Sequence, residues 1–142
     1  MAGTQLIIDA SGAHRRLGEL LDQLGDLEPV FADFGEYMVN EIQERFDDES
    51  GPDGTGWADL KPATWRRKKI PKILTETRRL RDSIIYKAEP RKLRIGTNVI
   101  YGAIHQLGGT AGRGAKIPAR PYLGVSSKNL EELEASLEDY LT

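Results

Sequence analysis

A chain of 142 residues, 39% hydrophobic and 30% charged, has the composition of a globular protein and not of a disordered or fibrous one. At this length one core buries about 68–70% of the surface that the unfolded chain exposes, so we expect a single domain over residues 1–142. No apolar run approaches the roughly 20 residues that span a bilayer, and the N-terminus shows no secretion signal, so no membrane partner is expected. The absence of cysteine excludes disulfides and thiolate metal sites, and it suits a reducing cytosol.

The net charge of −2 conceals a segregation of charge along the chain. Residues 1–60 hold 14 Asp and Glu against 3 Lys and Arg, residues 61–120 hold 3 against 16, and residues 121–142 hold 5 against 1. Three arrangements fit this pattern: the two halves fold against each other, opposite faces associate between copies, or the basic half contacts nucleic acid. The charge pattern alone leaves all three open.

The N-terminal part of the chain predicts a short strand followed by two helices. The apolar run at residues 5–9 indicates the strand. Leucines recur at helical spacing between residues 17 and 27, with Ser11 placed as a cap, which predicts a helix of some fifteen residues. Gly25 and Pro29 mark the break before the second helix. That helix is predicted by apolar residues at three- and four-residue steps: Phe31, Phe34, Met38, Ile42 and Phe46.

The middle of the chain predicts a turn or mobile loop, helical segments and a hairpin. Residues 47–56 are rich in glycine and polar residues, which is typical of a loop, and a short helix at 61–69 should follow. Another helical turn or two is expected at 74–82. Strands at 84–88 and 92–96, joined by a turn, then predict a β-hairpin, because the second strand alternates charged and apolar residues.

The C-terminal part predicts a short helix at 99–107, a loop and a last helix. Residues 108–114 read GGTAGRG, and four glycines in seven residues predict a flexible surface loop. Prolines make 118–121 an extended joint. Leucines at helical spacing from residue 130 to residue 141 predict the last helix, with Ser126 or Ser127 as its cap. The fold expected is α+β: amphipathic N-terminal helices and a C-terminal helix packed on a small antiparallel sheet, with a long mobile loop.

Five segments occur in an order that resembles one protein family. The sharpest two are YGAIHQLGG at residues 101–109 and IPARPYLG at 117–124. Three others precede them: GWADL at 56–60 running into TWRRK at 64–68, ILTETRRLRDSI at 73–84, and LRIGT at 93–97. As an ordered set over roughly residues 50–142, they resemble the phage virion morphogenesis family, the tail completion proteins of Mu-like and related tailed bacteriophages.

This resemblance implies a non-enzymatic structural phage protein that acts in tail completion or head-tail joining and assembles as a ring. The partners it implies are further copies of the chain and the phage tail tube or neck and connector proteins, with non-specific contact to passing DNA. The expected location is the virion tail or neck, and the host cytoplasm during assembly. Loops at 47–56 and 108–116 are expected to become ordered when they meet the next ring or the tail tube.

No cofactor or metal is expected from the chemistry-bearing residues. The segment at 109–116 resembles a nucleotide-binding loop only superficially, because Ala115 stands where that loop needs lysine and no hydroxyl follows Lys116. His14 and His105 are the only histidines. We interpret Tyr101 and His105, one helical turn apart, as a packed pair. An enzyme built around His105 would need a carboxylate or hydroxyl from a distant part of the chain.

The candidate interface combines tryptophans with basic residues. Trp57 and Trp65 are either buried anchors of a loop-to-helix junction or exposed anchors for a partner. The basic stretch at 61–81 could also contact phosphates without reading sequence, so a small nucleic-acid-binding protein is the alternative function. We expect the basic residues to meet the acidic half of a neighbouring subunit. The candidate subunit or partner interface consists of Trp57, Trp65, Arg66, Arg67, Lys68, Lys69, Arg113, Lys116 and Arg120.

Overall fold

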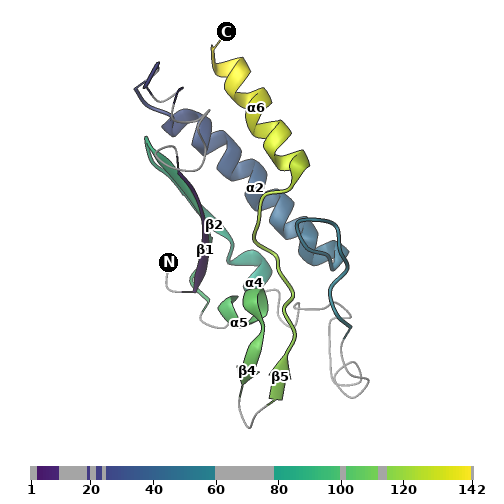
Figure 1. Cartoon of the computed structure of the whole chain (residues 1–142). Helices are drawn as coiled ribbons and strands as arrows, with labels where there is room; N and C mark the ends of the chain where they lie inside the picture. Colours follow the sequence, from purple (N-terminus) through teal and green to yellow (C-terminus); the bar gives the residue numbers. More distant parts are fainter. Residues whose placement is uncertain are drawn as a thin grey trace.

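The computed structural model describes residues 3–9, 19, 22–23, 25–59, 79–99, 102–111 and 115–141 (Figure 1). Its helices are α2 (Glu28–Asp48), α4 (Arg79–Asp82), α5 (Gly102–Leu107) and α6 (Ser127–Leu141). Its strands are β1 (Thr4–Asp9), β2 (Ile85–Ala88), β3 (Lys92–Thr97), β4 (Gly109–Ala111) and β5 (Ala115–Ile117). These elements confirm the α+β class. Within the ranges given, no helix is long and apolar enough to cross a membrane.

Two predicted helices fall largely outside the described residues. Of the predicted first helix, residues 19, 22 and 23 are described, and all three are helical. The predicted helix at 61–69 lies wholly outside.

β1, β3 and β2 form a three-stranded antiparallel sheet in that order. The β2–β3 hairpin was predicted from the sequence, and the pairing of β1 with β3 was not. Ile8 pairs with Leu93, and Ile7 with Arg94. Because paired residues point to the same face of a sheet, Ile8 and Leu93 lie on the buried inner face, whereas Ile7 and Arg94 lie on the outer face. The sheet therefore has one apolar face and one mixed face.

Helix α2 lies between this sheet and α6 (Figure 1). The five apolar residues that predicted α2 are fully buried, which confirms this helix as the centre of the core: Phe31, Phe34, Met38, Ile42 and Phe46. α6 packs on α2 through Leu133 and Leu137, both buried. The apolar stripe of α6 is covered by a helix and not by the sheet, so the described part of the chain has three layers.

Gly35 lets α2 approach the sheet closely. A Cβ atom at this position would lie 2.5 Å from the Tyr86 ring of β2. Glycine costs helix stability, yet here it removes the atom that would push helix and sheet apart.

The prediction of a flexible loop at 108–114 is wrong for residues 109–111, which form a strand. β4 and β5 pair as an antiparallel ribbon, with Gly109 opposite Ile117 and Ala111 opposite Ala115. The pairing is possible because the glycines are confined to the start and the tip, whereas residues 115–117 can extend as a strand. Residues 112–114, including Arg113, lie outside the described residues. The ribbon projects beyond the helices and the sheet (Figure 1).

Candidate assembly surfaces

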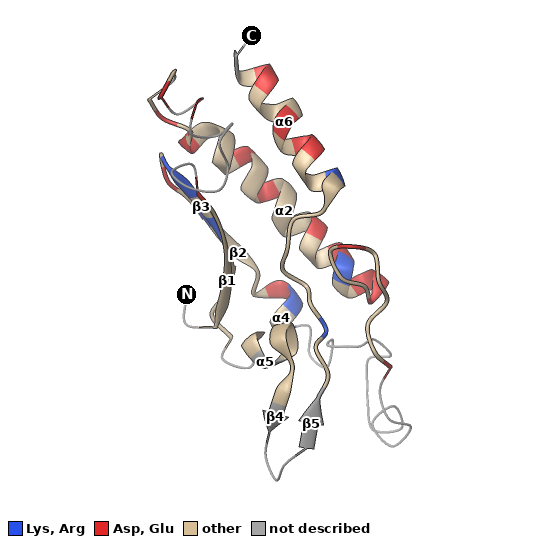
Figure 2. Ribbon diagram, viewed as in Figure 1, with Lys and Arg blue, Asp and Glu red and all other residues tan. Residues whose placement is uncertain are grey.

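Acidic residues dominate the two long helices. α2 carries seven Asp and Glu and α6 carries five, against only Arg45 and Lys128 as basic residues. Figure 2 shows these acidic residues spaced along the length of both helices. On α6 all five are exposed.

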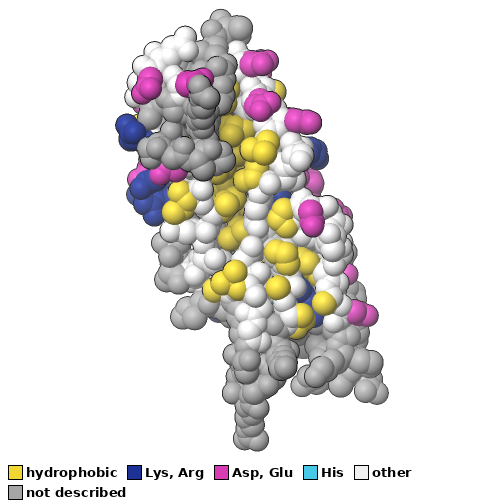
Figure 3. All heavy atoms as spheres, in the orientation of Figure 1, with side chains coloured by type: hydrophobic (Ala, Val, Ile, Leu, Met, Phe, Trp, Pro, Cys, Tyr) yellow, Lys and Arg dark blue, Asp and Glu magenta, His cyan; other side chains and the backbone are white. Residues whose placement is uncertain are grey.

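Within the described residues, several basic side chains lie instead on the hairpin of β2 and β3. Lys87 pairs with Arg94 in the sheet register, and Lys92 lies two residues from Arg94, so all three share the outer face. Figure 3 shows Lys and Arg side chains next to acidic ones on the side of the molecule away from α6, and mostly acidic side chains along α6. Among the described residues, α6 is therefore mainly acidic, whereas the hairpin carries basic side chains together with Glu89.

A hollow of about 680 Å³ lies where the end of α2, residues 50–54 and the start of α6 meet. Its lining includes Glu41, Glu44, Asp48 and Asp53, with Lys128 as a basic residue. Lys128 Nζ lies 3.3 Å from Glu41 Oε1, which ties α6 to α2 at the surface. Among the described residues no group of three or more His, Cys, Asp and Glu could hold a metal ion.

The two segments that carry the sharpest sequence motifs are joined by Gln106. We call the extended residues 120–125, which lead into α6, the clasp segment. Gln106 Oε1 accepts hydrogen bonds from the backbone N–H groups of Tyr122 and Leu123, both at 2.9 Å. Gln106 Nε2 donates to the Leu123 carbonyl at 3.0 Å. One side-chain amide from α5 thus does for this extended backbone what a neighbouring strand would do.

Tyr122 closes the same junction from the other side. Its hydroxyl donates to the Gly102 carbonyl at 2.7 Å, and the residue is fully buried. Burial raises the pKa of this phenol, so it remains a neutral donor. Its ring packs on Phe46 of α2, with ring centroids 5.3 Å apart.

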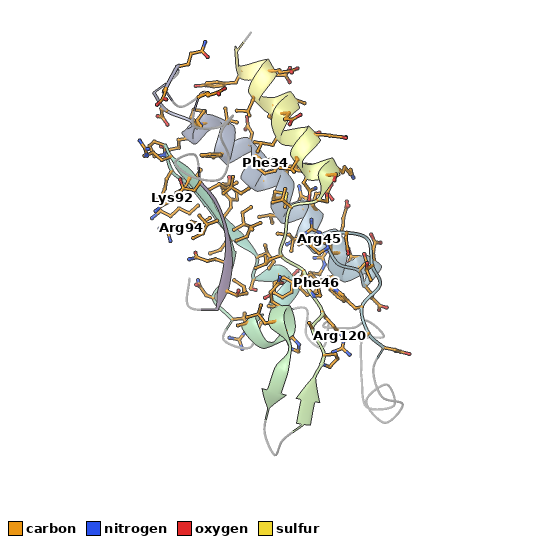
Figure 4. The ribbon with its side chains drawn as sticks, viewed as in Figure 1. Phe34, Arg45, Phe46, Lys92, Arg94 and Arg120 are labelled. Atoms are coloured by element: carbon orange, nitrogen blue, oxygen red, sulfur yellow. The ribbon has the colours of Figure 1, made fainter. Side chains whose placement is uncertain are left out.

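Arg45 binds the clasp segment from α2. Its guanidinium donates to the carbonyls of Tyr122 at 2.8 Å and Gly124 at 2.9 Å, and to Asn129 Oδ1 at 2.8 Å. Figure 4 places Arg45 between α2 and this segment. Burial lowers the pKa of Arg45, and the charge of Glu41 opposes that shift. An arginine keeps its proton in proteins, so the three neutral oxygens solvate a buried cation.

Asn129 links the Arg45 guanidinium to the first turn of α6. Asn129 N–H donates to Ser126 Oγ at 3.1 Å, and Ser126 N–H donates to Asn129 Oδ1 at 2.9 Å. This reciprocal pair is a capping box, with asparagine in the place usually taken by Glu or Gln. Ser126 is therefore the cap, one of the two residues predicted. Asn129 Nδ2 also donates to Tyr37 Oη at 3.0 Å.

Trp57 and Arg120, both predicted as interface residues, are used inside the subunit. Trp57 is buried, packs edge to face on Phe46 and donates from Nε1 to the Pro121 carbonyl at 2.8 Å. Arg120 is buried, and its guanidinium donates to the carbonyls of Ala58 and Asp59. Both side chains fasten residues 57–59 to the clasp segment, so most of their surface is used inside the subunit, and their assignment to a partner interface stays a prediction.

His105 lies beside the same segment. Its carbonyl accepts a hydrogen bond from Arg120 N–H at 2.7 Å. Burial lowers the pKa of His105, and the positive charge of Arg120 lowers it further. Tyr101, the partner expected for it, lies outside the described residues.

The remaining predicted interface residues keep their status as predictions. Trp65 and the basic run at 66–69 lie outside the described residues, as does Arg113. Lys116 is described as a strand residue of β5, opposite Thr110.

Sequence reasoning missed Arg45, Gln106 and Asn129. One signal existed for Arg45: it is the only basic residue of α2, and it falls three residues after Ile42 on the apolar face. No local signal marks Gln106 or Asn129, because their partners are set by the tertiary fold.

Comparison with known proteins places these residues in a family. Residues 8–142 match the phage virion morphogenesis family. The chain is 32% identical over 131 residues to the putative capsid assembly protein G of Escherichia phage Mu, covering 84% of each protein. It is 39% identical over 80 residues to the Mu-like prophage FluMu G protein 2 of Haemophilus influenzae, covering 54% of this chain and 58% of that protein. No solved structure matches.

Proposed function

Because this chain belongs to the phage virion morphogenesis family, we propose that it is a non-enzymatic structural protein that completes the tail or joins it to the head, working as a homo-oligomeric ring. The family match over residues 8–142 is the observation that carries this proposal. The chain then acts in the virion tail or neck, where its partners are further copies of itself and the tail tube or connector proteins.

Two features of the structure support an assembly role. The exposed residues of α6 are mainly acidic, whereas Lys87, Lys92 and Arg94 give the hairpin a basic component, an arrangement suited to contacts between copies. The β4–β5 ribbon projects from the body, where it can reach a neighbouring virion protein. The motif residues of the clasp segment then have a structural role, because they hold the base of the ribbon rigidly against α2 and α5.

Genetic complementation tests the proposal. A phage that encodes this chain is given a nonsense mutation in its gene, and lysates are examined by electron microscopy with and without the chain supplied in trans. Tail completion or joining requires DNA-filled heads and unjoined tails to accumulate without the chain, and complete virions to return with it. Native mass measurement and negative-stain microscopy of the purified chain test the ring.

Capsid assembly is a second candidate, because the phage Mu relative carries that description in its name. The same micrographs separate the two functions. Aberrant or empty heads in the absence of the chain favour capsid assembly, whereas normal filled heads exclude it. Steeply salt-dependent DNA binding by the purified chain would favour the nucleic-acid alternative instead.

A further inference from the structure

We propose that the outer face of the β1–β3–β2 sheet is the docking surface for the outward face of α6 from a second copy of this chain. The inference rests on the homo-oligomeric ring proposed above, and it names the two surfaces that meet in it.

The outer face of the sheet is an exposed mixture of apolar and basic side chains. Ile7 is 45% exposed and Ile85 is 46% exposed, which is high for isoleucine on a sheet. Gly96 pairs with Ile85 and adds no side chain between the two isoleucines. From the strand spacings, Ile7 and Ile85 are roughly 12 Å apart. The face is therefore open, shallow and partly apolar.

The charges on this face are mainly positive. Lys87 is exposed, and Arg94 and Lys92 are each about one third exposed. Glu89 offsets part of this charge, since its Oε2 lies 3.3 Å from Arg94 Nε and 3.9 Å from Lys92 Nζ. In Figure 4, Lys92 and Arg94 project from β3 away from α2. Asp9 pairs with Lys92 and adds a second carboxylate to this face. The three cations, within roughly 8 Å of one another, therefore exceed the carboxylates by one, and Lys87 is the most exposed of them.

The outward face of α6 has the complementary chemistry. Glu131, Glu134 and Glu138 are exposed and follow one another at three- and four-residue steps, so they form a stripe roughly 10 Å long. Ala135 is exposed within this stripe. Its methyl group and the aliphatic stems of the glutamates offer apolar contact to the two isoleucines, while the carboxylates reach the cations around them.

The geometry favours a second copy over contact within one chain. In one subunit the sheet and α6 lie on opposite sides of α2, so its sheet cannot reach its own α6 (Figure 1). A contact between two different surfaces is heterologous and leaves one of each surface free at the ends. Further copies add until the series closes, which is how rings form.

Two single charge reversals and their combination in one chain test the contact. Sedimentation velocity across a concentration series measures the association of each variant. Lys87→Glu on the sheet and Glu134→Lys on α6 should each raise the dissociation constant about fivefold or more, because each places like charges opposite one another. The double variant, Lys87→Glu with Glu134→Lys, should return to within about threefold of the parent chain if the two residues share one contact.

A matched control keeps the result interpretable. Glu28→Lys makes the same charge change as Glu134→Lys at an exposed position of α2, and it should leave association unchanged. Thermal melts check that each variant folds, because surface substitutions usually change stability little.

The failures of the two proposals are distinguishable. A parent chain that assembles while Lys87→Glu and Glu134→Lys assemble equally well overturns this docking contact and leaves the ring standing. A parent chain that remains monomeric in solution and in virions overturns the ring, and the contact with it.

Discussion

At the scale of single residues, the fold depends on a few buried polar side chains that hold an extended backbone without a partner strand. Arg45, Gln106 and Trp57 together bind the carbonyls of residues 121–124, and Gln106 also accepts two of their N–H groups. A buried backbone group left without a partner costs about 1–3 kcal/mol, so these side chains together remove several such costs. The same geometry explains why a charged residue is tolerated on the buried face of α2.

Replacing Arg45 is expected to be strongly destabilising. Arg45→Ala removes the donor for two carbonyls and for Asn129 Oδ1, and we expect a loss of about 3 kcal/mol or more in the free energy of unfolding, measured by urea titration. Arg45→Lys should recover only part of this loss, because an ammonium lacks the planar fork that reaches all three oxygens. A loss below about 1 kcal/mol for Arg45→Ala would contradict the role given to this residue.

The pKa of His105 makes stability depend on pH. Burial and Arg120 lower this pKa in the folded chain, so the unfolded chain binds the proton more readily, and acid favours unfolding. The contribution of the neutral imidazole is fully present above the unfolded pKa of about 6.5, and it is lost as pH falls through the folded pKa. Urea titrations at pH 7.5 and 5.5 should show a larger loss for the parent chain than for His105→Gln. Equal losses would place His105 in a solvated environment.

At the scale of elements, local periodicity predicts the parts of this fold whose partners lie nearby in sequence. The apolar spacing around Phe34 predicts α2 and its buried face, and alternation after residue 92 predicts the hairpin. The pairing of β1 with β3 joins residues some 90 positions apart, and no local pattern encodes it. The same distance hides the clasp, because Arg45 and the Tyr122 carbonyl are 77 residues apart. The glycines of 108–114 predict flexibility. The pairing of residues 109–111 depends on residues 115–117, which lie outside that glycine-rich segment.

Phe34 is expected to be among the most sensitive positions of α2. It is fully buried and stacks on Tyr37 with ring centroids 5.6 Å apart. Phe34→Ala should cost about 3–5 kcal/mol in denaturant titration, because it removes a large buried ring and leaves a cavity. Leu130→Ala, at a position that is 42% exposed on α6, serves as the control and should cost much less. Similar losses in the free energy of unfolding for the two variants would contradict the burial of Phe34 between α2 and its neighbours.

At the scale of the whole molecule, the described structure consists of a packed body and a projecting ribbon. The body contains the sheet, α2, α6 and the clasp segment, and the β4–β5 ribbon extends beyond it (Figure 1). The buried core that the structure describes is built from residues of this body. Stability and contact with a partner can therefore be changed separately.

Replacing residues 110–116 by a short Gly-Ser turn tests this separation. We expect the melting temperature to change little, because the described core lies in the body, and self-association to persist. Virion completion in the complementation assay should be lost, because the proposed contact with the tail or connector is gone. Restored virion yield with the shortened chain would show that the ribbon is only a connector.

The close packing of Gly102 against Tyr122 limits which substitutions and which recombination breakpoints related chains can tolerate. A Cβ atom at residue 102 would lie 2.8 Å from the Tyr122 hydroxyl and 2.7 Å from Thr97 Cγ2. A larger residue at 102 is thus accepted only when the neighbours at both 97 and 122 leave more room. Gln106 adds the requirement that residues 122 and 123 keep their backbone N–H groups, which excludes proline there. Recombination between relatives should preserve function when its breakpoints fall outside residues 97–124, and should fail when a breakpoint separates these partners. We therefore expect related phages to exchange residues 97–124 together and not in part.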